Sequence, residues 1–165
     1  MACQHLAIEH SHAIVALIDN ESYGSALALQ RPLFEAVVRG VWLRYAASED
    51  EVDKAAKGRF PILERMTSES PESTSQGDPP PLQVLKDRWW KRLCGYTHGG
   101  PEQILARLDH TGVRATYLNE EVLAALRWSD LVQLFAGIQM ADAADNAPLV
   151  QAFMAHDSDF DEEAS

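Results

Sequence analysis

The sequence predicts an all-α protein folded as a bundle of four to five helices. Apolar residues recur at steps of three and four over most of the 165 residues, which is the spacing of a buried helix face. No useful length of chain alternates polar and apolar residues with the period of two that a β-strand shows. No internal repeat is visible, so helices packed as up-and-down neighbours are the simplest architecture.

The periodic segments define the expected helices in order along the chain. They span residues 3–19, 23–47, 49–57, 82–96, 101–109 and 119–146. One or two further turns are expected within residues 148–156. His10 lies within the apolar stripe of the first helix. Pro32 lies inside the second helix and removes one backbone hydrogen bond there, so we expect this helix to kink near Leu29 and then continue.

Capping and turn residues bound the shorter elements. Ser48, followed by acidic residues, is typical of a helix start, and Gly58 of a helix end. Pro101, which follows two glycines, suits the first turn of a helix. Asn119 precedes the last long periodic segment. The stretch HTGVRAT, residues 110–116, is expected to form a turn.

We expect one helical-bundle domain over residues 1–156 and a tail over residues 157–165. Within the domain, residues 67–81 (TSESPESTSQGDPPP) are nearly free of apolar side chains and predict a flexible surface linker. The tail has an aspartate at every second position but lacks the glycine of a calcium-binding loop. A disordered acidic C-terminal tail is therefore the better interpretation.

The composition limits the classes of function. The net charge of −11 disfavours a protein that neutralises many phosphates, although Lys86, Arg88, Lys91 and Arg92 form a local basic segment. The longest apolar run is far shorter than a membrane span, and the N-terminus does not have the pattern of a secretion signal, so a cytoplasmic location is expected. Two distant cysteines do not make a disulfide framework, so both are expected to be reduced structural thiols.

The first candidate site is the pair Arg92 and His98, in the stretch RWWKRLCGYTHGGPEQ. The two residues bracket a predicted helix end and a glycine-rich turn, where both side chains and backbone amides can converge on a substrate. The alternative is that Arg92 is a solvated helix cation and His98 caps the turn. Spacing alone does not separate the two interpretations.

The second candidate is a buried polar cluster or ligand-binding pocket. Arg31 lies in an apolar stripe and needs a partner if it is buried, and Glu35 follows one helical turn later. We expect His10, Arg31, Glu35 and Tyr96 to take part in this cluster, with His98 as a further member.

Metal binding is the third alternative. Glu9 and His12 have the Glu-x-x-His spacing of carboxylate-bridged metal bundles, but those sites use the motif twice. A di-metal oxidase is therefore disfavoured, and a single zinc held by histidines and Glu35 is only slightly better supported. We expect no metal and no cofactor.

The adjacent Trp89 and Trp90 cannot both face one core. One of them is therefore expected to cover a cleft or to contact a partner, which favours a homodimer.

Two longer stretches carry a resemblance to known proteins. YGSALALQRPLFEAVVRG and YTHGG are the most specific parts of a match that runs over roughly residues 6–145. The chain resembles a family of small uncharacterised bacterial helical proteins, a domain of unknown function. The resemblance implies a further helix before the first one here.

More distantly, the arrangement resembles the HEPN superfamily, which includes metal-independent RNases of toxin and defence systems. The family motif is an arginine, often followed by a polar residue, and then a histidine; Arg92 and His98 match it, whereas Leu93 departs from it. The resemblance implies two chains that bring their motifs together, with His98 as general acid or base and Arg92 stabilising charge on an RNA phosphate. The alternative is a non-catalytic helical interaction or ligand-binding module, such as an acidic inhibitor or regulator of a protein partner.

Overall fold

The computed structural model describes residues 1–71 and 78–162, and these residues form eight helices and one short antiparallel ribbon. The elements are α1 (Ala2–Asp19), α2 (Tyr23–Tyr45), α3 (Glu49–Ala55), α4 (Leu63–Ser68), α5 (Pro81–Thr97), α6 (Pro101–Leu105), β1 (Leu108–Asp109), β2 (Gly112–Val113), α7 (Asn119–Ala143) and α8 (Ala147–Glu162). The prediction of an all-α protein is confirmed.

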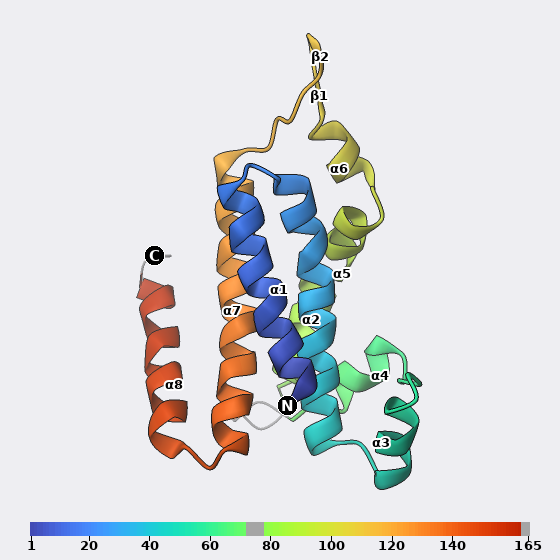
Figure 1. The fold of residues 1–165 in the computed structure, drawn as a ribbon, viewed down its shortest axis with the longest axis vertical. Coiled ribbons are helices and arrows are strands. Elements are labelled where there is room, and N and C mark those ends of the chain that lie inside the picture. Colours follow the sequence, from blue (N-terminus) through green and yellow to red (C-terminus); the bar gives the residue numbers. More distant parts are fainter. Residues whose placement is uncertain (72–77, 163–165) are drawn as a thin grey trace.

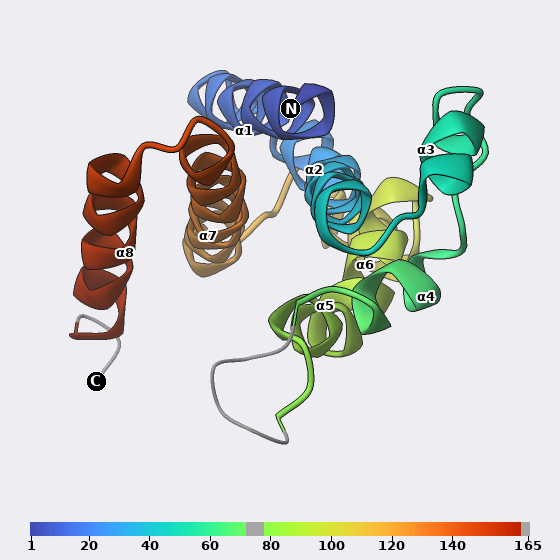
Figure 2. The same ribbon diagram turned by 90° about the horizontal axis from the view of Figure 1, so that it is seen from below.

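Helix α2 lies at the centre of the molecule and packs against α1, α5 and α7 (Figures 1 and 2). It supplies much of the core, including the fully buried Leu33, Phe34, Val38 and Trp42. Helix α8 runs beside α7 on the outside of the assembly. The short elements α6, β1 and β2 lie at one end of the long axis, and α3 and α4 lie towards the other (Figure 1).

The packing of α1 on α2 depends on small residues. The buried positions of α1 are Gln4, Ala7, Ser11 and Ile14, at steps of three and four. The hydroxyl of Ser11 lies 3.0 Å from the hydroxyl of Ser129 in α7, so this helix is fixed to two neighbours at once.

The apolar spacing of α1 predicts a buried stripe of Leu6, His10, Ala13, Ile14, Leu17 and Ile18. Ile14 is buried, and Leu17 and Ile18 pack against the core, whereas the N-terminal part of the stripe is not buried. Leu6 is 42% exposed, and His10 is only half-buried. Apolar residues of α1 itself occur on most sides of the helix, so hydrophobicity alone does not determine which face is buried. The face with small side chains is the one that lets neighbouring helices approach closely.

Helix α2 continues through Pro32, as expected, and the kink near Leu29 stays a prediction. Proline has no N–H, so the carbonyl of Ala28, four residues earlier, loses its helical partner. The Thr97 hydroxyl at the end of α5 can donate to this carbonyl at 3.2 Å and to the Leu93 carbonyl of its own helix at 2.9 Å. The carbonyl that Pro32 leaves without a helical partner therefore forms a contact between α2 and α5.

The ribbon β1–β2 was not expected from the sequence, which predicted only a turn here. Leu108 pairs with Val113, and Asp109 with Gly112. The Asp109 carboxylate accepts a hydrogen bond from the Thr111 N–H at 2.6 Å, and Gly112 has a φ of +134°. An aspartate turn followed by glycine thus tightens the expected turn into a two-residue ribbon.

Helix α4 was also missed, and it changes the start of the predicted linker. Thr67 is fully buried, and its hydroxyl donates to the Gln83 side-chain oxygen of α5 at 2.5 Å, with the Leu63 and Glu64 carbonyls at 3.2 and 3.1 Å. Ser70 is buried too. Residues 67–70 are therefore packed rather than part of a surface linker, and residues 72–77 lie outside the described residues.

Helix α8 extends to Glu162, beyond the one or two turns expected within residues 148–156. It therefore enters the segment where a disordered tail was expected, and that prediction is not confirmed for residues 157–162. Residues 163–165 lie outside the described residues.

Candidate functional site

Helix α5 and its C-cap carry the two predicted catalytic residues, Arg92 and His98. Its core-facing side includes the buried Leu93 and Tyr96, and Arg88 and Lys91 are exposed on its outer side. The helix ends at Thr97, with His98 as its C-cap, and Gly99 has a φ of +65°. A Cβ on Gly100 would lie 2.8 Å from the Gly95 Cα, so the glycine turn folds α6 tightly back onto α5.

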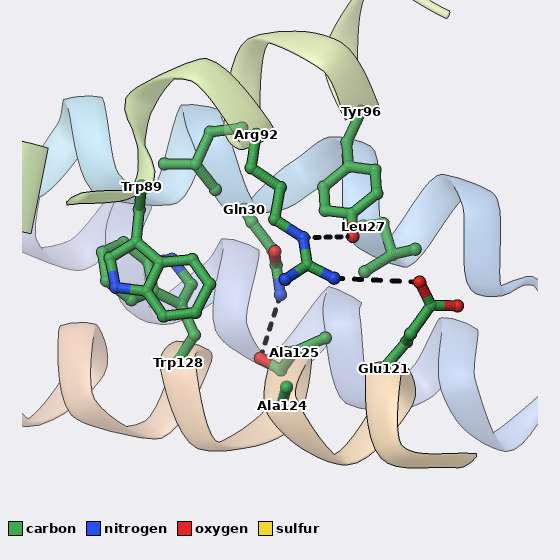
Figure 3. Close-up of a pocket in the computed structure, with 10 residues that line it drawn as sticks. Leu27, Gln30, Trp89, Arg92, Tyr96, Glu121, Ala124, Ala125 and Trp128 are labelled. Atoms are coloured by element: carbon green, nitrogen blue, oxygen red, sulfur yellow. Dashed lines mark hydrogen bonds and ion pairs between the residues drawn. The ribbon is translucent and has the colours of Figure 1, made fainter. Parts of the chain in front are cut away.

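Arg92 bridges α5 and α7 (Figure 3). Its Nε donates to the Tyr96 hydroxyl at 2.7 Å, and its guanidinium lies 3.7 Å from the Glu121 carboxylate. The guanidinium also lies over the Tyr96 ring at 5.5 Å. The side chain is 42% exposed, so it remains accessible although its direction is fixed.

A small inner cavity lies beneath Arg92, between α2, α5 and α7 (Figure 3). Gln30 crosses its floor and donates to the Ala125 carbonyl at 3.0 Å. Trp128 also lines the cavity, and its buried Nε1 has no hydrogen-bond partner within the described chain. The cavity volume is about 10 Å³ for the centre of a water molecule, which is enough for one water and excludes a nucleotide.

A wide groove opens outside Arg92, between α5, α6, the irregular segment before α7, and the start of α7. We call it the basic groove; it is lined by Arg88, Lys91, Arg92, Tyr96, Glu102, Leu105, Ala106, Thr116, Leu118 and Glu121. Its cavity volume is about 710 Å³. This is within the usual size range of ligand pockets.

The cations on the wall of the basic groove differ in their partners. Arg92 approaches Glu121, whereas Arg88 and Lys91 form no ion pair with any described residue. Arg88 contacts the Trp89 ring, at 5.6 Å. The groove therefore presents two cations that no carboxylate of the described residues neutralises.

His98 belongs to a different cluster, which joins α5 to α2. The Arg31 guanidinium contacts the His98 Nε2 and lies over the Trp90 ring at 4.6 Å. Arg31 Nε also donates to Glu35 at 2.8 Å, and Arg39 donates to the other carboxylate oxygen at 2.8 Å. The side chains of Arg31 and Glu35 are 22% and 18% exposed, so this pair is mostly buried.

The structure thus does not bring Arg92 and His98 together within one chain. Six residues correspond to about 240° around a helix. Arg92 faces α7, whereas His98 contacts Arg31 of α2. Their catalytic role stays a prediction.

The expected polar cluster is divided in the same way. Arg31 and Glu35 are paired, and His98 joins them. Tyr96 instead bonds to Arg92 on the other side of α5. His10 is half-buried on α1 and forms no hydrogen bond with Arg31 or Glu35.

Sequence reasoning missed a polar junction that holds α6 in place. The Gln103 amide donates to the Gly24 carbonyl at 2.7 Å and to the Tyr96 carbonyl at 3.1 Å. The Tyr117 hydroxyl donates to the Gln103 side-chain oxygen at 2.6 Å and accepts a hydrogen bond from Arg107 at 2.6 Å.

This junction has one sequence signal, which is Gly24 in the first turn of α2. A Cβ there would collide with Arg107 and Tyr117, so only glycine allows their close approach. Burial, as the largest cause, raises the pKa of the Tyr117 phenol above its ordinary value, and Arg107 opposes this shift. The phenol therefore stays protonated and donates its hydrogen bond at neutral pH.

The possible metal ligands of α1 do not assemble into a site. Within the described residues there is no group of three or more His, Cys, Asp and Glu side chains that could hold a metal ion. Cys3 and Cys94 are both free thiols. Nor is any described helix both long and apolar enough to span a membrane.

A family model described as a family of unknown function (DUF6988) matches residues 4–164, so the chain belongs to this family. The resemblance to an uncharacterised helical domain is thereby confirmed, and a relation to the HEPN superfamily is not shown. No curated protein and no solved structure matches the chain.

Proposed function

We propose that this member of the DUF6988 family is a non-catalytic helical binding module, and that its basic groove holds an anionic partner. The observation that carries the proposal is the pair of free cations, Arg88 and Lys91, in a chain with a net charge of −11. Seven other cations are paired with carboxylates among the described residues; these are Arg31, Arg39, Arg44, Lys54, Arg65, Lys86 and Arg92.

Free cations in an acidic chain favour a particular kind of partner. The negative field of the whole molecule repels long polyanions, while the local field of the groove attracts a small number of well-placed negative groups. Arg92 adds a third positive charge whose position is fixed by Tyr96 and Glu121. The groove therefore suits recognition of a few anionic groups rather than a continuous phosphate backbone.

A metal-independent RNase of a toxin or defence system is the competing function. It requires His98 to move a proton at a ribose hydroxyl while Arg92 stabilises the adjacent phosphate. Because these side chains contact different helices, a homodimer would have to bring His98 of one chain to Arg92 of the other. The contacts of Arg92 with Tyr96 and Glu121 favour a fixed recognition charge over a mobile catalytic one.

The test compares two double variants with the same change of charge. Arg88→Glu with Lys91→Glu alters the groove, and Lys57→Glu with Arg59→Glu alters exposed, unpaired cations elsewhere; each takes the net charge from −11 to −15, because −11 − 4 = −15. Fluorescence anisotropy measures binding of labelled short poly-glutamate peptides and of labelled short single-stranded RNA, both in chelator.

We expect the wild-type chain and the control variant to bind at least one probe, and the groove variant to bind it about tenfold more weakly or worse. No binding of either probe, or equal losses in both variants, contradicts the proposal.

The same RNA samples test the rival function. Cleavage products are followed on gels for the wild-type chain and for His98→Ala, an exposed position whose replacement leaves the core intact. We expect no cleavage by either protein. Cleavage by the wild-type chain that is lost in His98→Ala would replace the binding module with the RNase.

A further inference from the structure

The far side of the basic groove is apolar and exposed. Leu105 of α6 is 66% exposed and Leu118, just before α7, is 56% exposed, and both line the groove opposite the cations of α5. Ile104, Leu108 and Val113 are also exposed around α6 and the ribbon. Exposed apolar side chains gathered beside a groove are typical of a surface that binds another protein.

We infer that the basic groove binds an acidic amphipathic helix of a partner protein. Its carboxylates pair with Arg88 and Lys91, and its apolar side chains pack on Leu105 and Leu118. This inference rests on the proposed function and specifies its partner. It commits to a protein segment because of the combination of charge and apolar surface in one groove.

The spacing of the cations supports a helical ligand. Arg88, Lys91 and Arg92 follow one another at steps of three and one, so Arg88 lies one turn from each of the other two. Carboxylates one turn apart on a partner helix match this spacing. A groove of about 710 Å³ takes a few anchoring side chains, not a whole helix, which is how helices commonly dock on a grooved surface.

Nucleic acid fits the same groove less well. Glu102 and Glu121 both line it and would repel a backbone with a charge on every nucleotide, whereas a peptide can place its few carboxylates away from them. Base stacking also lacks a platform, because Trp89 packs against Trp128 with ring centroids 5.3 Å apart.

A peptide selection tests the inference without a known partner. A phage library of random peptides of about 12 residues, long enough for three helical turns, is selected on the immobilised full chain. Enriched peptides are then synthesised, and their affinities are measured by anisotropy. The proteins compared are the wild-type chain, the groove and control charge variants, and Leu105→Ser with Leu118→Ser, whose exposed positions permit folding.

We expect the enriched peptides to share two acidic residues three or four positions apart and at least one large apolar residue. The groove charge variant should weaken binding by about tenfold or more, and the leucine variant by about fivefold or more. The control variant should stay within about twofold of the wild-type chain.

Several outcomes overturn the inference. These are no enrichment, enriched peptides without acidic residues, or peptides that bind all variants equally. Groove-dependent binding of RNA or poly-glutamate without any groove-dependent peptide would keep the proposed anionic site and reject the helical protein partner. Failure of every probe would reject both.

Discussion

The two flanks of α2 are held by different kinds of contact. On the flank towards α1, Ala26, Leu33 and Gly40 recur every seven residues, and a Cβ on Gly40 would collide with the Gln4 side chain of α1. On the flank towards α5 and α6, the Ala28 and Gly24 carbonyls accept hydrogen bonds from Thr97 and Gln103.

The two flanks of α2 therefore differ in how they are packed. The first flank excludes water through close packing of small and branched side chains, which tolerates little change of volume. The second flank combines the buried Leu93 of α5 with individual polar contacts, and α5 meets α7 through Arg92 with Glu121 and Trp89 with Trp128. The groove that we propose as the binding site lies along this less completely closed side.

The largest expected effect contrasts one leucine from each region. Leu33 is fully buried, so Leu33→Ala should lower the free energy of unfolding by about 2–5 kcal/mol through lost burial and a cavity. Leu105→Ala removes the same atoms from a side chain that is 66% exposed, and should change it by less than about 0.5 kcal/mol. Urea denaturation measures both. Similar losses would show that Leu105 of α6 is packed as tightly as Leu33 of α2.

The second prediction concerns the hydrogen bond that docks α5 at the proline of α2. Thr97→Val keeps the shape of the side chain but leaves the Ala28 carbonyl without its donor, so it should cost about 1–2 kcal/mol. Pro32→Ala restores a backbone N–H that can bond to the same carbonyl.

In the Pro32→Ala background, Thr97→Val should therefore cost less, and a double-mutant cycle by urea denaturation measures the difference. Additive effects would show that Thr97 acts independently of the proline.

The sequence predicts the parts of the fold that depend on local periodicity. The long helices α1, α2, α5 and α7 each begin and end close to their expected bounds, because apolar spacing and capping residues are local properties. The buried face of α1 was predicted correctly at Ile14, Leu17 and Ile18 but not at Leu6, because apolar residues occur on most sides of that helix and only its neighbours decide which face is covered. Helix α4 was missed because Thr67 and Ser70 are polar residues that are buried by packing.

The candidate site was less predictable for a related reason. The sequence identified Arg31 with Glu35 because their spacing in one helix implies contact. It did not show that Arg92 and His98 lie in different clusters, because their partners Glu121 and Arg31 come from different helices. Gln103 carried almost no signal, since three of its four partners lie on backbone atoms or far from it in the sequence, and only the long contact from Arg107 at 3.5 Å has helical spacing.

A third prediction tests the polar junction of α6. Tyr117→Phe removes a hydroxyl that bonds to Gln103 and Arg107, and should cost about 1 kcal/mol. Tyr23→Phe is the matched control, because its ring lies 5.9 Å from that of Tyr117 and the change is the same; we expect an effect below about 0.5 kcal/mol.

The Tyr117 phenol also provides a spectroscopic test. Because its pKa is raised in the folded chain, its stabilising contribution is present below the ordinary tyrosine pKa and is lost as pH rises through the raised value. The pKa of the Tyr45 phenol is also raised, with burial as the largest cause, so an ultraviolet titration of the wild-type chain should contain two late-titrating phenols, one of which is lost in Tyr117→Phe. An unchanged late phase in the variant would assign it to another tyrosine.

The smallest effect on stability is expected at Glu121, at the mouth of the basic groove. A change there should alter binding more than packing. Glu121→Gln removes a partly exposed ion pair whose atoms are 3.7 Å apart, so the free energy of unfolding should change by less than about 1 kcal/mol. The variant amide can still accept the hydrogen bond that Glu121 takes from the Leu118 N–H at 3.2 Å.

Affinity should respond in the opposite direction, because the change frees Arg92 and removes one repelling charge from the groove. An acidic peptide selected on the wild-type chain should bind Glu121→Gln about two- to threefold more tightly, whereas Glu120→Gln, the same change at the exposed neighbouring residue, should alter its affinity less. Equal gains in the two variants would mean that net charge alone governs binding. A loss in Glu121→Gln alone would mean that the ion pair holds Arg92 in its binding position, so that the contact between α5 and α7 is part of the recognition surface itself.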